Sequence, residues 1–259
     1  MDKHAAMKEL EALGNAATVK TYRRHNISGP TFGVRYGDMY KLQKKVGVDT
    51  ALAEQLFATG NHDARVLACM LADPAEVSAK TLDAWVQAVD NQLLVDGLAG
   101  LAARHPKSAA RVEKWVALKP EWQAATGWHA IAALAARADV PDAFFDRWLD
   151  VIGRDLHKSA NRVRYSMNAA LIAIGVRGPA LRKKALRIAQ QLGQVDVDHG
   201  QTSCKTPDAA AYIRKVVEHD RRRAARKAPA QKKAAKQAQG AQEQPQKGPA
   251  RKPAARRKS

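Results

Sequence analysis

Apolar residues recur every three to four positions through most of the first 220 residues, and this helical spacing is the strongest constraint on the fold. No stretch alternates apolar and polar residues between turn signals, which is the pattern of a half-buried strand. The sequence therefore predicts an all-α protein. The expected helices are 3–13, 16–25, 36–46, 49–58, 62–72, 78–88, 91–104, 107–118, 121–137, 142–157, 161–175, 179–192 and 207–219.

Several of these helices form pairs. The second members begin near residues 61, 90, 121 and 161, at spacings of 29, 31 and 40 residues. Short antiparallel pairs at such spacings are typical of an α-solenoid of HEAT-like helix pairs, in which each pair buries its apolar face by stacking on its neighbours. In such an array the second helices line one concave surface, and a basic concave surface suits a nucleic-acid duplex.

The last 39 residues have a different composition. Between Arg221 and Ser259 there are fourteen Lys or Arg residues and one acid, Glu243, so this tail carries +13 of the formal net charge of +19. It has almost nothing apolar to bury, and its like charges repel one another, so we expect it to be disordered. The sequence thus predicts a helical repeat domain at 1–220 and a disordered Lys/Arg/Ala/Pro-rich tail at 221–259.

The tail predicts a polyanionic partner. Each Lys or Arg that neutralises a phosphate releases condensed counterions, which gives tight binding at low salt with little sequence preference. Duplex DNA is the expected partner, and RNA is a second possibility because the tail by itself does not distinguish the two.

Other classes of protein are disfavoured. Cys69 and Cys204 lie far apart, which indicates free thiols in a reducing compartment. The chain begins Met1-Asp2-Lys3-His4 without an apolar signal segment, and no stretch has the roughly 18 apolar residues of a membrane span. We expect a monomeric cytoplasmic protein, associated with the nucleoid, that contacts no membrane. Nucleotide-loop and paired-cysteine motifs are missing from the sequence, so no cofactor or metal is expected.

Three parts of the sequence carry a resemblance to a known family. They are 32–38 together with 59–65, the run 82–96, and the helix 161–175. Over about residues 3–218 the chain resembles the bacterial DNA alkylation repair family of HEAT-repeat, DNA-glycosylase-like proteins. The resemblance implies a solenoid that grips duplex DNA and, in the enzymatic members, hydrolysis of the glycosidic bond to cationic N3- or N7-alkylated purines.

The resemblance also implies a candidate catalytic residue, Asp96. A cationic purine is already a good leaving group, so one carboxylate that stabilises the oxocarbenium-like transition state could suffice. Three other site positions depart from the family pattern: its aromatic residues fall on Gln92 and near Ala169, and its arginine falls on or near Ala125. Whether this chain excises bases or only binds DNA is therefore left open, and an ordinary solvated carboxylate is the alternative for Asp96.

Basic and aromatic side chains give candidate DNA contacts. Arg162 and Arg164 open the helix 161–175 beside Lys158, where basic groups and free backbone N–H groups both favour phosphate. Arg35 and Lys41 lie in a second basic cluster, with Lys44 and Lys45. Most of the tryptophans are expected in the core, and the two with a possible place in the groove are Trp122 and Trp128.

Two further motifs have simpler interpretations. His62, Asp63 and Arg65 open a helix behind Asn61, where a cap and a first-turn carboxylate stabilise the helix end. The loop from Asp196 to Cys204 contains four possible metal ligands. Because no second Cys/His pair accompanies them, we expect this loop to pack the last helix onto the array.

These observations support three hypotheses. The first is a DNA-binding protein of the alkylation repair type that possesses or has lost base excision. The second is a catalytically inactive HEAT-repeat DNA-binding or scaffold protein. The third is an RNA-associated factor.

Overall fold

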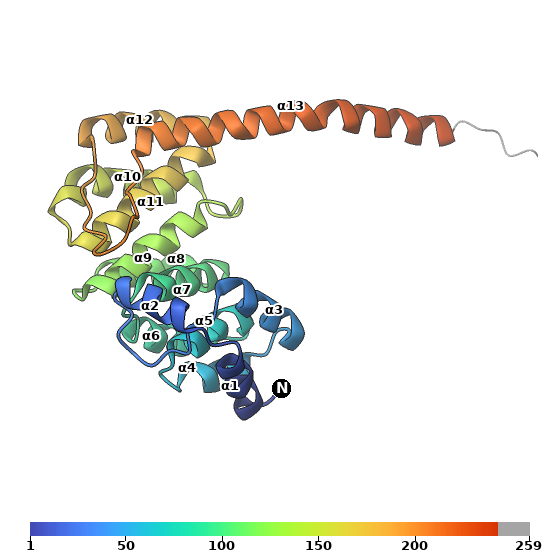
Figure 1. Cartoon of the computed structure of the whole chain (residues 1–259). Helices are drawn as coiled ribbons and strands as arrows, with labels where there is room; N and C mark the ends of the chain where they lie inside the picture. Colours follow the sequence, from blue (N-terminus) through green and yellow to red (C-terminus); the bar gives the residue numbers. More distant parts are fainter. Residues whose placement is uncertain (243–259) are drawn as a thin grey trace, which may run out of the picture. The chain divides into compact units, whose positions relative to one another are not determined.

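The computed structural model describes residues 1–242, and these form α-helices joined mostly by short loops, with longer connections at 25–35 and 193–208 (Figure 1). The helices are α1 (Lys3–Ala12), α2 (Ala16–Arg24), α3 (Tyr36–Val46), α4 (Thr50–Phe57), α5 (His62–Leu71), α6 (Ala79–Gln87), α7 (Gln92–Arg104), α8 (Ser108–Val116), α9 (Glu121–Leu134), α10 (Asp142–Asp155), the 3-10 turn η1 (Leu156–Lys158), α11 (Asn161–Arg177), α12 (Pro179–Leu192) and α13 (Ala209–Gln242).

Local chemistry explains where these helices begin and end. From α1 to α12 every boundary lies within three residues of the predicted one. Asn61 caps α5 by accepting from the Ala64 N–H, as predicted, and Gly47 and Gly193 end α3 and α12 with positive φ. The cap of α7 is Asn91, which follows another residue suited to capping, Asp90. Short polar side chains at neighbouring positions are equally suited to capping, so the sequence pattern could not choose between them.

The helix pairs stack as an α-solenoid, which confirms the predicted fold. The pairs α4/α5, α6/α7, α8/α9 and α10/α11 are each in contact. The second helices also contact one another in series, from α5 to α7 to α9 to α11. We call the open side of this row of four helices the second-helix face.

The first helices of successive pairs are joined by ion pairs. Each link connects an acidic residue on the first helix of one pair to a basic residue on the first helix of the next pair. The links run from α6 through α8 and α10 to α12. The members are Asp83 with Arg111 and Lys114, Glu113 with Arg147, and Lys184 with Asp146 and Asp150. These contacts neutralise charge on the first-helix layer and fix how the repeats follow one another.

A buried carboxylate fixes the loop before α3. Asp63 is fully buried at the start of α5. Its oxygens accept hydrogen bonds from the Thr31 hydroxyl (2.8 Å) and from the backbone N–H groups of Phe32 (2.6 Å) and Val34 (3.0 Å). Because α3 follows this loop directly, Asp63 also sets the position of Tyr36, the first residue of α3.

The last helix extends into the segment that was expected to be disordered. The chain divides between Arg214 and Lys215 into two units. The helix α13 runs from Ala209 to Gln242, well past the predicted end at residue 219, and the rest of the expected tail, 243–259, lies outside the described residues. Ala, Gln, Lys and Arg all have high helix propensity, so such a segment forms a helix without burying apolar surface. Within residues 1–242, none of the helices combines the length and the apolar composition needed to cross a bilayer.

Candidate nucleic-acid interface

The second-helix face is defined at its centre by one stripe of α7. Gln92, Asp96, Gly100 and Arg104 follow one another at four-residue intervals, so they lie on the same side of the helix. Gly97 lines the same cavity as Gly100. Because neither glycine has a side chain, the helix surface is recessed between the polar residues. The Asp96 and Arg104 side chains are therefore accessible from the open side of the array.

Asp96 is held by two neighbours. Its Oδ1 accepts a hydrogen bond from Gln92 Nε2 at 2.7 Å, one turn earlier on α7. The same oxygen lies 3.2 Å from Nε2 of His129, which reaches across from α9. The carboxylate remains 45% exposed, so it is positioned but not enclosed. The arrangement ties α7 to α9 on the second-helix face.

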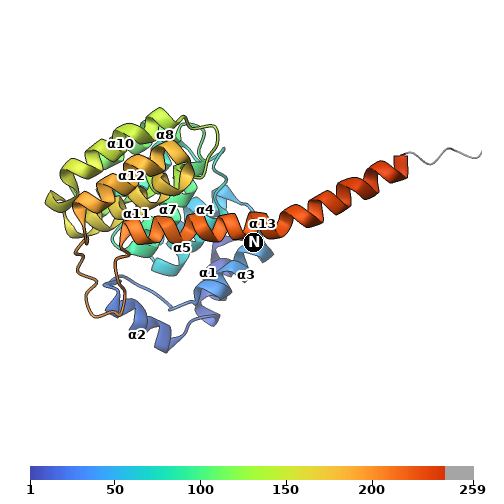
Figure 2. The ribbon, with the colours of Figure 1, turned by 90° about the horizontal axis from the view of Figure 1, so that it is seen from above.

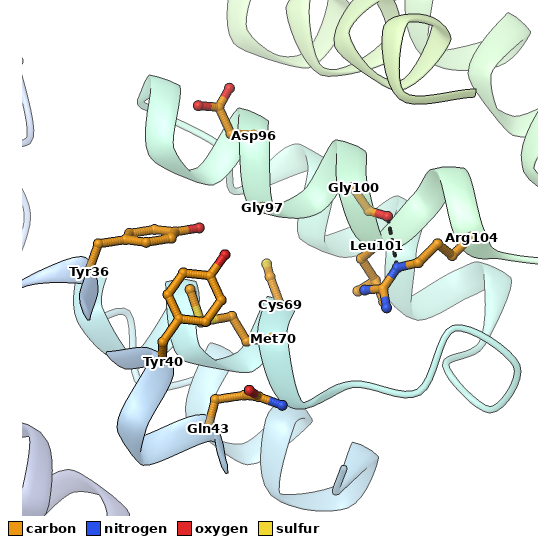
Figure 3. A pocket seen from close by; sticks show the side chains of 10 residues that line it. All are labelled: Tyr36, Tyr40, Gln43, Cys69, Met70, Asp96, Gly97, Gly100, Leu101 and Arg104. Atoms are coloured by element: carbon orange, nitrogen blue, oxygen red, sulfur yellow. Dashed lines mark hydrogen bonds between the residues drawn. The ribbon is translucent and has the colours of Figure 1, made fainter. Parts of the chain in front are cut away.

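A cavity of about 350 Å³ lies beside Asp96 between α3, α5 and α7 (Figure 3). Tyr36 and Tyr40 form one wall, with ring centroids 5.2 Å apart in an edge-to-face arrangement. Partial burial raises the pKa of Tyr36, and Asp96 contributes to the shift. Figure 3 shows both rings on one side of α7, whereas the Asp96 carboxylate points away from them. The tyrosines and the carboxylate therefore do not converge on one point.

A second cavity, of about 290 Å³, lies on the other side of Gln92. Its floor comes from the first residues of α7, α9 and α11, and its walls are α2 and the loop between α12 and α13. Figure 2 shows this loop beside α2. Arg162 lies over the ring of Trp122, with Cζ 5.4 Å from the centroid. We call this space the Trp122 cavity.

The structure brings together some of the predicted contact residues. Arg162 and Trp122 form a cation–π pair, and both line the Trp122 cavity. Arg164 is two residues from Arg162, which places it about 200° around the helix. It is partly buried, with its Nε unpartnered within the described residues. The two arginines therefore lie on different sides of α11, and Arg162, not Arg164, lines the Trp122 cavity.

The other predicted contact residues do not line the Trp122 cavity. Trp128 is 4% exposed and packs edge-to-face on Trp148, so it belongs to the core and not to a groove. Lys158 is exposed on η1, and Arg35 is exposed just before α3. Lys41 is exposed but paired with Asp38 at 2.8 Å.

The positions that depart from the family pattern are also informative. Ala125 is completely buried, and its methyl group offers Asp96 neither a charge nor a hydrogen bond. His129, one helical turn later, occupies that place. Ala169 lines a small cavity with Tyr165 and Tyr212. The carboxylate at Asp96 is therefore surrounded by an amide and an imidazole in place of the aromatic and arginine side chains that the resemblance implied.

The two remaining motifs are structural in this fold. His62 is buried against the edge of Tyr22, and Arg65 lies over the Phe57 ring. In the loop after α12, Asp198 exchanges two hydrogen bonds with the side chain of Asn161, through its N–H (2.7 Å) and its C=O (2.8 Å). These contacts hold the loop against the start of α11. Within the described residues, no three His, Cys, Asp or Glu side chains gather in an arrangement that could hold a metal ion.

Sequence reasoning missed His129, Tyr36 and Tyr165 as parts of the face. A spacing signal was present for His129, because it lies seven residues after Trp122 and therefore on the same side of α9. No local signal marks Tyr36, since its place beside α7 depends on the loop that Asp63 holds.

Stacked helix pairs with accessible polar residues along one row of helices define a helical-repeat protein of the HEAT-like α-solenoid class. The chain belongs to the DNA alkylation repair enzyme family, whose model matches residues 6–213. An uncharacterized protein of Listeria innocua is 30% identical over 214 residues, which cover 80% of this chain and 94% of that protein. An uncharacterized protein of Listeria monocytogenes is 29% identical over the same proportions.

The fold is also similar to a solved structure with a TM-score of 0.77 and 30% sequence identity. The match covers 85% of this chain and 96% of the other. That protein is described as one of a new family related to the HEAT-like repeat DNA glycosylases with affinity for branched DNA structures.

Proposed function

We propose that this protein binds DNA along the second-helix face, as a member of the alkylation repair family that acts mainly by binding. The observation that carries the proposal is the distribution of paired and unpaired cations. The basic residues that join the first helices are paired with acids, and the α12 cations Lys183 and Arg187 lie outside these links. On the second-helix face, Arg104 of α7 and Arg162 of α11 make no ion pair within the part of the chain whose side chains are described, and neither does Arg35 just before α3. Unpaired cations beside one face favour a phosphate backbone there.

The affinity of the similar solved protein for branched DNA supports the same proposal. It favours a distorted or branched duplex over a uniform one as the preferred form. The helix α13 adds exposed Arg221, Arg222, Arg223 and Arg226, which increase attraction to any nucleic acid irrespective of sequence.

The test compares two double variants that each remove two exposed positive charges. Arg35→Gln with Arg104→Gln removes cations beside the second-helix face, and Lys183→Gln with Arg187→Gln removes unpaired cations from α12 in the first-helix layer. We expect the first pair to weaken binding to a three-way junction and to reduce the salt dependence by about one unit of slope for each phosphate that the replaced side chains neutralise. The α12 pair should change neither quantity. Equal weakening by both pairs would show that the face has no special role.

Base excision is a second candidate function, favoured by one observation. The Oδ2 atom of Asp96 makes no hydrogen bond within the described residues and belongs to a half-exposed carboxylate, so it could face a deoxyribose. An Asp96→Asn protein should then bind methylated duplex but release no 7-methylguanine, with Glu11→Gln on α1 as a matched surface control. Equal release by the wild type and the Asp96→Asn protein would show that Asp96 has no part in the mechanism. If the wild type releases no base, DNA binding is the function that remains.

A further inference from the structure

The Trp122 cavity lies where three helices begin. Gln92 is the first residue of α7, and Trp122 and Arg162 are the second residues of α9 and α11. Each helix directs the positive end of its dipole toward its first turn, where the Asn91 side chain accepts from the Leu94 N–H and Glu121 Oε1 accepts from the Arg162 N–H. The Arg162 guanidinium makes no ion pair within the described residues, so it makes the floor of the cavity attractive to an anion.

The walls of the cavity are largely apolar and aromatic. Tyr22 and Ile27 approach from the α2 side, and Tyr165 lies next to Trp122 on the α11 side. Burial lowers the pKa of His199, which faces Tyr165 edge-on with ring centroids 5.6 Å apart, so this side is neutral near pH 7. The volume of about 290 Å³ is near the lower limit for pockets that hold small ligands, about 300 Å³. The cavity therefore suits a single flat ring with an attached anion.

The amide of Gln92 is held in place by Asp96. A carboxylate accepts but does not donate, so the group that Gln92 directs at Asp96 must be its NH₂. The Oε1 atom is buried, so a molecule in the cavity does not reach it, and recognition falls to the aromatic walls and to Arg162.

We propose that the Trp122 cavity holds one unpaired nucleotide of a branched or bulged DNA. Its base lies against Trp122 and Tyr165, while its phosphate pairs with Arg162. This inference rests on the proposed DNA-binding function and gives a reason for a preference for branched over fully paired DNA.

The first experiment measures affinity for a duplex with one unpaired nucleotide and for the same duplex fully paired. We expect the wild-type protein to bind the bulged duplex several-fold more tightly. Trp122→Leu removes the aromatic surface but keeps an apolar side chain, so it should lower only the affinity for the bulged duplex, by about fivefold. The matched control is Tyr40→Leu, because Tyr40 lines the other cavity; it should change neither affinity.

The second measurement uses the two cysteines. Cys204 is exposed and lines the Trp122 cavity, whereas Cys69 is buried and burial raises its pKa to about 12. A thiol reagent should therefore modify Cys204 first, and the bulged duplex should slow that reaction more than the paired duplex does. Circular dichroism on each variant confirms that the fold is retained.

Equal affinity of the wild type for both duplexes, or equal protection of Cys204 by both, would overturn the proposal while leaving DNA binding intact. Failure of the wild type to bind either duplex would instead contradict the proposed function itself.

Discussion

At the scale of single residues, Asp63 is a carboxylate buried in the core, and no cation is paired with it within the described residues. The side chain is 0% exposed, and the Thr31 hydroxyl together with the N–H groups of Phe32, Gly33 and Val34 donates to its two oxygens. Hydrogen bonds to an ionised acceptor are stronger than neutral ones, so three converging backbone donors compensate for much of the missing hydration. One residue thereby fixes both the start of α5 and the loop that leads to α3.

Replacing Asp63 with Asn should be strongly destabilising. The amide NH₂ of Asn would face backbone N–H groups that need an acceptor, which leaves buried donors unpaired. We expect the free energy of unfolding to fall by about 3 kcal/mol. Urea denaturation measures this, with Glu11→Gln as the control, which should change it by less than about 0.5 kcal/mol. An equally small change at Asp63 would show that the loop is held in another way.

Buried histidines, of which His62 is one, make the free energy of unfolding depend on pH. Burial lowers the pKa of His62, and it also lowers the pKa of His105 and His199. The unfolded chain, with a histidine pKa of about 6.5, therefore binds more protons than the folded one at mildly acidic pH. The contribution of these residues to stability is present above about pH 6.5 and is lost as the pH falls from there toward the folded-state values.

We expect the free energy of unfolding to decrease between pH 7.5 and pH 5.5. A His62→Gln protein should be less stable at the higher pH but should lose less on acidification, because one of the three groups no longer titrates. Urea denaturation at both pH values measures the difference. Identical pH dependence in the two proteins would mean that His62 contributes nothing to it.

At the scale of the helices, two glycines distinguish close packing from open surface. A Cβ at Gly127 of α9 would lie 2.6 Å from the Val116 N atom and 2.9 Å from the Trp115 carbonyl carbon. The backbone of α8 therefore packs directly against α9 at Gly127 (Figure 1). A Cβ at Gly100 of α7 would meet nothing within 4 Å. Both positions are helical, so their difference comes from packing alone.

Ala substitution at these glycines should therefore act in opposite directions. Gly127→Ala forces the α8/α9 pair apart and should lower the unfolding free energy by about 1–3 kcal/mol. Gly100→Ala gains helix propensity and should raise it by about 0.5–1 kcal/mol. Thermal denaturation of the two proteins measures the contrast, and an equal effect of both substitutions would contradict the packing of α8 on α9.

At the scale of the whole molecule, the basic C-terminal segment should dominate the salt dependence of DNA binding. Deletion of residues 221–259 removes fourteen Lys or Arg residues and one acid. We expect the slope of log K against log salt to become several units shallower, at about 0.9 for each phosphate that the segment neutralises. A full-length protein with Gln at those basic positions controls for length and should behave like the deletion. An unchanged slope would rule out a contribution of the segment to DNA binding.

The sequence by itself determined the helices, their pairing and the excess of positive charge. Helix ends depend on side chains close in the chain, such as Asn61 and Gly47, and the repeating apolar stripe requires each pair to stack on the next. These are local interactions, and a local pattern is sufficient to predict them. At α13 two signals in the sequence disagree: the absence of apolar residues argues for disorder, while the high helix propensity of the same residues permits the helix that runs to Gln242.

Only the tertiary structure decided which side chains meet. Trp122 and Trp128 look equivalent in the sequence, yet one lies under Arg162 and the other lies in the core against Trp148. His129 faces Asp96 because α9 stacks beside α7 with a rotation that no single helix encodes. Contacts between residues 33 positions apart depend on how the helices pack, and packing is a property of all the interlocking side chains together.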